Sequence, residues 1–293
     1  MDSFWSALIP ATGLRRFESL IRPLAIESIP VQRACSADTG PLCLFLEEFF
    51  GSSTGPTLKP VLDPSNEIIL FVQEKGSIIA SIRYKYAGLF ENQPIHIIDC
   101  FCVHPSKRKS GLATKLLGTL HRYTNERQLR YSLFLKEGRA LPNHRPLYSS
   151  HYVFRPCSGH LKTSLSPLKA QALVAAYRQL YPDTLWVYDV DNANQQWLFW
   201  KEGLEWILVC IQDAYQTHKG GRIGWISACF ASEPVRSDPF ERLLEQAPYS
   251  WIWMDEKWLP EGSTDWSIDG PFHWYAYQWS TNLSVHKFYG IVV

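Results

Sequence analysis

The sequence has almost no net charge and no long apolar run. Its 29 basic and 28 acidic residues leave a formal charge of +1 over 293 residues. Without an overall field, a charged ligand has to be met by a local cluster, so we expect no nucleic-acid partner. The apolar runs, such as residues 68–72, are strand-sized and far short of the roughly 20 residues that span a bilayer. We expect no integral membrane segment.

The cysteines also lack a functional pattern. They form no Cys-x-x-Cys pair and no metal-type spacing with His, so we expect no metal site. Their odd number, and the absence of a charged and then apolar leader with a cleavage site, favour a reducing interior over secretion. We therefore expect a cytoplasmic protein. The seven cysteines are Cys35, Cys43, Cys100, Cys102, Cys157, Cys210 and Cys229.

Apolar and aromatic residues are plentiful, at 46% and 14% of the chain, which is enough for a substantial core. Hydrophobic periodicity predicts helices at 42–50, 112–127, 168–180 and 240–246. It predicts strands at 68–74, 76–86, 95–103, 131–136, 205–212, 222–230, 250–254 and 272–279. The order of elements is similar before and after a Ser, Thr and Pro-containing stretch at 157–167. This indicates an α+β fold in two related halves, at 1–157 and 158–293.

The strongest local signal is a strand followed by a basic glycine loop and a helix. The predicted strand at 95–103 leads into Arg108-Lys109-Ser110-Gly111-Leu112-Ala113. The first backbone N–H groups of a helix have no internal partners, and together with the helix dipole they form an anion site. Lys107, Arg108 and Lys109 add positive charge, and Gly111 and Ala113 allow close approach. A pyrophosphate fits this arrangement, although a basic turn that merely caps a surface helix has the same pattern.

This loop resembles the acyl-CoA pyrophosphate loop of the GNAT superfamily, and the flanking sequence resembles the protein N-myristoyltransferases. Asp99-Cys100-Phe101-Cys102-Val103-His104 is similar to that family's Asn-Phe-Leu-Cys-Val-His strand. Further similar segments follow in the right order, and even Phe4-Trp5 with Pro10 resembles the arm that wraps CoA in the family. These later segments are Gly138-Arg139-Ala140-Leu141-Pro142, Tyr152 with Arg155, Asp269-Gly270 with Tyr275, Tyr277 and Trp279, and the apolar Gly290-Ile291-Val292-Val293.

The resemblance implies a GNAT-like fold, with mixed, mostly antiparallel sheets flanked by helices and two GNAT-like halves. It implies transfer of a fatty acyl group from myristoyl-CoA, or another acyl-CoA, to the N-terminal glycine amine of a peptide or protein. We expect a monomer that needs no metal. The half at 1–157 would bind acyl-CoA, and the half at 158–293 would provide the peptide groove and the catalytic C-terminus.

The resemblance also implies roles for individual residues. The backbone N–H groups of Cys100 and Phe101 would stabilise the oxyanion, and the terminal carboxylate of Val293 would take the proton of the amine. Asp99, Lys136, Tyr152, Asp269 and Gly270 would contact the acceptor substrate. The acyl-CoA contacts would be Phe4, Trp5, Phe101, Cys102, Val103, Lys107, Arg108, Lys109, Ser110, Gly111, Leu112 and Ala113.

Departures from the family pattern keep other functions open. Asp99 and Lys136 stand where the family has Asn and Thr, and we expect them to form an ion pair that resets the acceptor site. The family's acidic loop after its first helix is replaced by Gly51-Ser52-Ser53-Thr54, and its His is Phe154 here. The alternatives are a GNAT that acetylates a small amine or a lysine, and an inactive module that binds acyl-CoA or peptide.

Overall fold

The computed structural model describes most of the chain. The described residues are 15–16, 30–50, 56–90, 93–129, 131–142, 144–159, 164–180, 185–186, 195–232, 234–277, 279–280 and 288–289. Four α-helices lie in this part: α2 (Thr39–Phe49), α3 (Leu112–Glu126), α4 (Pro167–Leu180) and α5 (Ser237–Leu244). The described residues also contain three short 3-10 helices: η1 (Ser36–Asp38), η2 (Pro105–Lys107) and η3 (Glu256–Trp258).

The strands of the described residues are β1 (Arg15–Arg16), β2 (Val31–Arg33), β3 (Thr57–Leu58), β4 (Ile68–Glu74), β5 (Ser77–Phe90), β6 (Gln93–Val103), β7 (Tyr131–Glu137), β8 (Tyr148–Pro156), β9 (Leu185–Trp186), β10 (Gln195–Glu202), β11 (Glu205–His218), β12 (Gly221–Ala231), β13 (Trp251–Asp255), β14 (Ser267–Tyr277), β15 (Trp279–Ser280) and β16 (Phe288–Tyr289). The mixture of helices and strands confirms the predicted α+β fold.

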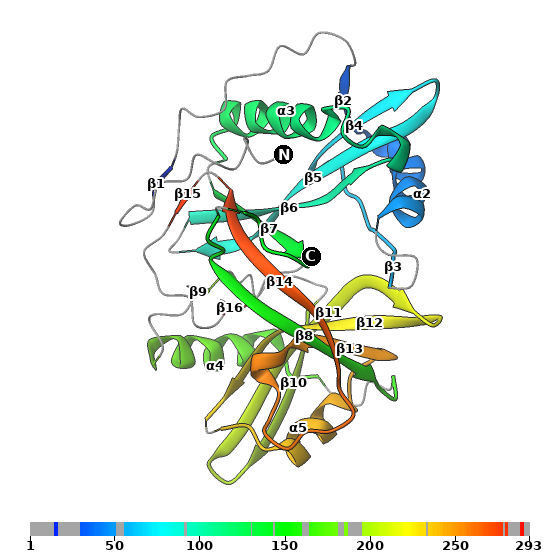
Figure 1. Cartoon of the computed structure of the whole chain (residues 1–293). Helices are drawn as coiled ribbons and strands as arrows, with labels where there is room; N and C mark the ends of the chain where they lie inside the picture. Colours follow the sequence, from blue (N-terminus) through cyan, green and yellow to red (C-terminus); the bar gives the residue numbers. More distant parts are fainter. Residues whose placement is uncertain are drawn as a thin grey trace.

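One sheet of 12 strands runs through the molecule (Figure 1). Its order is β10-β11-β12-β13-β8-β14-β7-β6-β5-β4-β2, and β3 pairs with β11. Most neighbours are antiparallel, whereas β6 with β7 and β12 with β13 are parallel. β14 lies between β7 and β8, so a strand from the expected second half completes the sheet of the first half.

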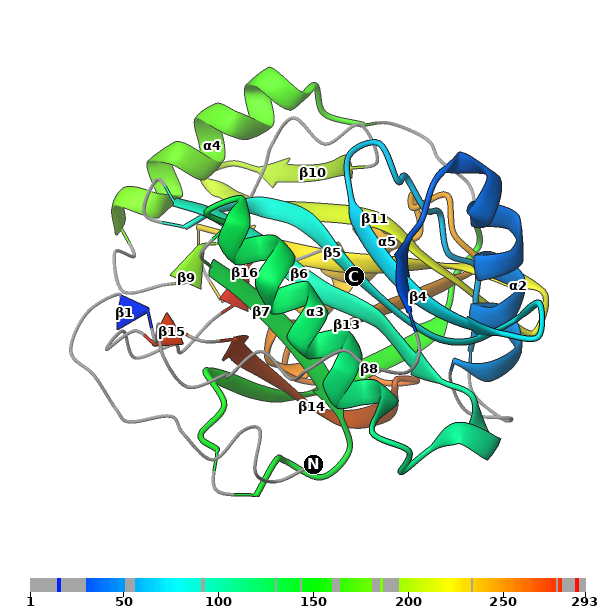
Figure 2. The same ribbon diagram turned by 90° about the horizontal axis from the view of Figure 1, so that it is seen from above.

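Helices α2 and α3 cover opposite faces of the sheet around β4, β5 and β6 because side chains alternate along each strand. In β4, Leu70 packs in the cluster with Leu116 and Leu120 of α3, whereas Phe71 packs with Leu42 of α2. Figure 2 shows α3 lying across this part of the sheet, with α2 at its side. The two helices therefore pack on opposite faces of β6, the strand that precedes the glycine loop.

Helices α4 and α5 cover the strands at the other end of the sheet in the same way. In β11, Leu208 packs with Val174 of α4, and Val209 packs with Phe240 of α5. Between the two ends, an aromatic cluster that includes Trp225, Trp253 and Trp274 fills the core. In the part of the chain described, no helix is long and apolar enough to cross a membrane.

Candidate active site

The parallel strands β6 and β7 separate partway along their length. They pair from Ile95 with Tyr131 to Ile98 with Phe134, and no further pairs join the two strands among the described residues. β6 continues to Val103, whereas β7 continues to Glu137 with β14 as its neighbour on the other side. Among the described residues, the backbone groups of β6 that face β7 thus have no strand partner beyond Ile98. An extended ligand can hydrogen-bond to β6 in this opening as an added strand does.

A β-bulge in β6 lies at the start of this opening. Ser81 of β5 pairs with Cys102 and Arg83 pairs with Asp99, so Cys100 and Phe101 both oppose the single residue between them. Cys100 has φ +46°, a left-handed conformation that is rare for a residue other than glycine. The buried Ser81 hydroxyl donates a hydrogen bond to the Cys100 carbonyl oxygen at 3.0 Å. The expected oxyanion residues thus lie in a strained backbone segment. The hydrogen bond from Ser81 of the neighbouring strand β5 supports this conformation.

Asp99 forms an ion pair with Arg83, so the expected Asp99–Lys136 ion pair is wrong. Arg83 Nε and Nη2 donate to the two carboxylate oxygens of Asp99, each at 2.7 Å, and Arg83 Nη1 donates to the Val61 carbonyl oxygen at 2.9 Å. Lys85 Nζ lies 3.9 Å from Asp99 Oδ2. The Lys136 ammonium instead donates to the carbonyl oxygen of Glu137 at 3.0 Å.

Strand pairing explains why Asp99 contacts Arg83 and not Lys136. Arg83 is the direct partner of Asp99 across the β5–β6 ladder, whereas Lys136 belongs to β7 beyond its pairing with β6. The Asp99 side chain is only 8% exposed. Burial by itself raises the pKa of Asp99, but the Arg83 guanidinium and its hydrogen bonds outweigh burial and hold that pKa below its ordinary value.

The glycine loop that is predicted to bind an anion lies at the N-terminus of α3. Gly111 caps the helix with φ +84°, and a Cβ at this position would meet nothing within 4 Å. The Lys115 N–H donates to the Gly111 carbonyl oxygen at 3.0 Å, so the N–H groups of residues 112–114 precede the first bond of the helix. Glycine is needed here for its backbone conformation, and the space in front of the helix is open.

Only part of the basic cluster is available to a phosphate. Lys107 forms an ion pair with Glu74 at 2.5 Å. The exposed Arg108 guanidinium donates to the Val103 carbonyl oxygen at 3.4 Å, and exposed Lys109 takes φ +65°. The Ser110 hydroxyl donates to the Lys107 carbonyl oxygen at 2.6 Å. Arg108 and Lys109, with the helix dipole, provide the main positive charge at this loop.

The two cysteines of β6 are core residues. Cys100 and Cys102 pack with Phe45 and Leu46 of α2. Burial raises the pKa of the Cys102 thiol to about 11, and it raises the pKa of Cys100 further, with the nearby Asp99 charge adding to it. Because the thiolate is the reactive form, neither side chain is suited to form an acyl-enzyme. The N–H groups of Cys100 and Phe101 stay the predicted oxyanion donors.

The expected acceptor residues lie on four adjacent strands, β6, β7, β14 and β8. Tyr152 of β8 is 4% exposed, and its hydroxyl accepts a hydrogen bond from Trp274 Nε1 at 3.4 Å. Asp269 of β14 is half-buried, and burial raises its pKa. Burial and the Asp269 charge together raise the pKa of Glu137, at the end of β7. The structure thus brings Asp269 beside Glu137, whereas Tyr152 is part of the aromatic core.

Three expected site residues lie outside the described residues: Phe4, Trp5 and Val293. Sequence reasoning missed Ser81, Arg83 and Glu137. The available signal for Arg83 was a charged residue within the otherwise uncharged start of β5, with an acidic residue, Asp99, in the next strand. Among the described residues, no group of three His, Cys, Asp or Glu side chains is arranged to hold a metal ion.

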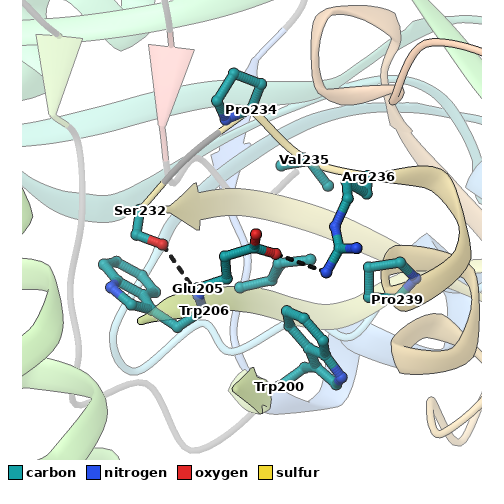
Figure 3. Close-up of a pocket in the computed structure, with 9 residues that line it drawn as sticks. Trp200, Glu205, Trp206, Ser232, Pro234, Val235, Arg236 and Pro239 are labelled. Carbon is teal, nitrogen blue, oxygen red and sulfur yellow. Dashed lines mark hydrogen bonds and ion pairs between the residues drawn. The ribbon is translucent and has the colours of Figure 1, made fainter. Parts of the chain in front are cut away.

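A separate small pocket lies where the β10–β11 hairpin meets the segment after β12 (Figure 3). Its volume is about 10 Å³, the space of about one water molecule. Arg236 occupies one side, with its guanidinium 2.6 Å from Glu205 and 5.9 Å from the centre of the Trp200 ring. Since its own ion pair occupies it, this pocket is not a candidate active site.

Comparison with known proteins agrees with this geometry. Residues 42–150 match the acetyltransferase (GNAT) family, a stretch that contains β6, the glycine loop and α3. Two solved structures of Saccharomyces cerevisiae N-myristoyltransferase superimpose with TM-scores of 0.61 and 0.63, each at 12% sequence identity. The first comparison covers 89% of this chain and 86% of that one, and the second covers 97% and 92%. No curated protein matches the sequence.

The yeast protein was solved with bound myristoyl-CoA in one structure, and with myristoyl-CoA and inhibitors in the other. At this identity the likeness concerns the fold, and it confirms the expected GNAT-like fold of the N-myristoyltransferase kind. Together with the matched family, it supports an acyltransferase of the GNAT type. The division at residues 157 and 158 stays a prediction.

Proposed function

From a GNAT domain built into the fold of the N-myristoyltransferases, we propose that this chain transfers a myristoyl or similar long-chain acyl group from CoA to the N-terminal glycine amine of a peptide or protein. The observation that carries the proposal is the bulge at Cys100 and Phe101. It lies where β6 leaves β7, and the same strand leads directly into the anion loop of α3. One ligand with a thioester and a pyrophosphate can use both features.

The acyl donor would bind along β6. Its pyrophosphate would accept hydrogen bonds from the first N–H groups of α3, beside Arg108 and Lys109. Its thioester carbonyl would accept hydrogen bonds from the N–H groups of Cys100 and Phe101, which typically contribute about 3–4 kcal/mol each to the transition state of acyl transfer. The pyrophosphate contacts at α3 would set how far along β6 the thioester lies, and so would place it at the bulge.

Transfer would then proceed by direct attack. The glycine amine nitrogen forms a bond to the thioester carbon, the carbonyl oxygen takes negative charge at the bulge, and the C–S bond breaks to release CoA as a thiol. The proton lost by the amine needs a base, because an α-amine has a pKa near 8. The resemblance to the N-myristoyltransferases assigns this role to the Val293 carboxylate, which lies outside the described residues.

We also propose that the enzyme acts in the cytoplasm. All seven cysteines are free thiols in the structure. Free thiols of this number are typical of a reducing compartment.

Mass spectrometry tests the proposed reaction. A glycine-initiated peptide incubated with the protein and myristoyl-CoA should gain one myristoyl group at its α-amine, and the same peptide with an acetylated N-terminus should not react. Acetyl-CoA serves as the control donor, because faster acetyl transfer would favour the acetyltransferase alternative. Tight binding of acyl-CoA without any transfer would favour an inactive binding module.

A variant extended by two residues after Val293 tests the base separately. We expect the extended protein to bind myristoyl-CoA with unchanged affinity and to lose acyl transfer. Full activity in the extended variant would exclude the terminal carboxylate and leave the base to another group.

A further inference from the structure

Four charged side chains are buried together beside the bulge of β6. They are Arg83 and Lys85 of β5, Asp99 of β6, and Glu67 directly before β4, and each side chain is between 6% and 13% exposed. Arg83 pairs with both carboxylates, since its guanidinium lies 2.7 Å from Asp99 and 3.5 Å from Glu67. Both acids of the cluster are therefore held by Arg83, and Lys85 is a second cation without a close pair.

The amine of Lys85 has one distant partner. Its Nζ lies 3.9 Å from Asp99 Oδ2, and no side chain or carbonyl group among the described residues accepts a hydrogen bond from it. Both oxygens of Asp99 already accept from Arg83. Burial lowers the pKa of Lys85, and the Asp99 charge offsets this only in part. A larger fraction of this lysine is thus the neutral amine, which is the nucleophilic form.

The same geometry brings this amine close to the expected oxyanion donors. Lys85 is opposite Ile97 in the β5–β6 ladder, and its side chain extends along the strand to Asp99. Asp99 directly precedes Cys100, so the Lys85 nitrogen contacts the residue next to the bulge at which the thioester carbonyl would bind. The four-carbon stem of lysine is flexible and lets its nitrogen move further in this direction. The chain therefore carries an amine of its own beside the proposed acyl group.

We propose that Lys85 is a self-acylation site, which receives the acyl group of a bound acyl-CoA when no acceptor is present. The neutral Nζ forms a bond to the thioester carbon, the carbonyl oxygen takes negative charge at the N–H groups of Cys100 and Phe101, and the C–S bond breaks. The proton lost by Nζ goes to the leaving thiolate, so the products are an Nε-acyl-lysine and CoA as a thiol. The proposal rests on the proposed function for its acyl donor and oxyanion site, but it needs no acceptor peptide.

Self-acylation would also switch the enzyme off. An acyl group attached to Lys85 stays beside the bulge, where it blocks both a new thioester and an acceptor amine. An acceptor peptide bound at the site would compete with Lys85 for the acyl group, so the modification would accumulate only when acyl-CoA is present without acceptor.

Mass spectrometry of the wild-type protein tests this proposal. The protein is incubated with myristoyl-CoA at neutral pH without any peptide, and proteolytic fragments locate the added group. We expect a single myristoyl group on each modified chain, attached to Lys85. Heat-denatured protein, treated in the same way, measures the ordinary reaction of lysines with the thioester. Lys85 should react about tenfold more slowly there, because nothing holds the acyl group beside it.

Two variants show whether the position of the lysine matters. Lys85→Arg keeps a cation beside Asp99 but has no nucleophilic amine, so it should gain no acyl group. Lys201→Arg is the matched control, since Lys201 is exposed near the end of β10, far along the sheet from β5. It should be modified at Lys85 at the rate of the wild-type protein.

The outcomes separate this proposal from the proposed function. An unmodified native protein would overturn self-acylation, and so would groups found only on other lysines or equal rates in the native and denatured protein. Transfer to glycine-initiated peptides by a chain that is never modified at Lys85 would refute self-acylation and leave the proposed function standing. Modification of Lys85 without transfer to any peptide would support self-acylation and refute the proposed function.

Discussion

The buried side chain of Ser81, in β5, supports the backbone at the proposed oxyanion site in β6. Its hydroxyl is the side-chain donor to the Cys100 carbonyl oxygen, at 3.0 Å, and it is buried. A bulged residue in a left-handed conformation persists only where its surroundings hold it. Because the N–H of Phe101 belongs to the same peptide unit as this carbonyl, Ser81 fixes the direction of one expected oxyanion donor.

Ser81→Ala should therefore lower kcat about tenfold while KM for acyl-CoA stays within about twofold, because misaligned donors weaken mainly the transition state. Stability should fall by about 1 kcal/mol for the lost hydrogen bond. Steady-state kinetics and denaturant unfolding measure the two effects. Ser77→Ala, at an exposed position of the same strand, is the control. An unchanged kcat in Ser81→Ala would contradict this positioning role.

Asp99 should contribute to stability in a pH-dependent way. Its pKa is held below the ordinary value of 3.8 in the fold, so its stabilisation is complete above that value and is lost as pH falls through the folded pKa. Asp99→Asn leaves Arg83 without its main partner and should cost about 2–4 kcal/mol at neutral pH. Chemical unfolding from pH 7 to pH 2 should show the difference shrinking below about pH 4. A constant difference down to pH 2 would refute the ion-pair account.

For single residues, the sequence could suggest which backbone N–H groups are expected to bind the thioester, but not how their conformation is supported. The Cys100 and Phe101 positions follow from the motif, whereas their support by Ser81 and Arg83 depends on strand register. The Asp99–Lys136 hypothesis failed for this reason. A charged residue in a strand can pair with either neighbouring strand, and only the observed register selects Arg83.

Among the helices, the backbone conformation at the N-terminus of α3 should depend on Gly111. An alanine at φ +84° costs roughly 1–2 kcal/mol, so Gly111→Ala should turn the first N–H groups away from a phosphate. We expect a Kd for acyl-CoA about tenfold higher, measured by calorimetry. Gly118→Ala, in the middle of the same helix with no atom within 4 Å of its Cβ, should leave the Kd unchanged and stabilise the protein by about 0.5–1 kcal/mol. Equal affinities in both variants would argue against an anion site here.

The predicted elements agree with the structure wherever apolar periodicity was regular. The strand predicted at 68–74 has the bounds of β4, and the helix predicted at 112–127 differs from α3 by one residue. β8 and β10 were not predicted. In β8, inward positions include the buried Ser150, and in β10 the four consecutive apolar residues at 197–200 hide the alternation. Pairing with neighbouring strands, on both sides for β8 and with β11 for β10, makes these segments strands.

At the scale of the molecule, the two predicted halves share one sheet. β14 pairs with β7 on one side and with β8 on the other, so a chain cut after residue 157 would expose both strands. Order along the sequence could suggest two related halves, but it could not reveal this interleaving. Long-range pairing joins residues more than 100 positions apart, and no local signal encodes it.

The fragment 1–157 should consequently fail to fold by itself. Near-ultraviolet circular dichroism should show no fixed aromatic packing in the fragment, and urea unfolding of the whole chain should be a single transition by both fluorescence and circular dichroism. A fragment that unfolds cooperatively would show that the first half is an independent domain.

The central claim is that acyl-CoA binds along β6, with its thioester at the bulge. A crystal structure of the protein with an unreactive myristoyl-CoA analogue tests this most directly. If acyl-CoA binds in this way, its acyl carbonyl oxygen should lie within about 3 Å of the Cys100 or Phe101 nitrogen, and its pyrophosphate at the first N–H groups of α3. An analogue bound elsewhere, or with its carbonyl turned away from β6, would contradict the account.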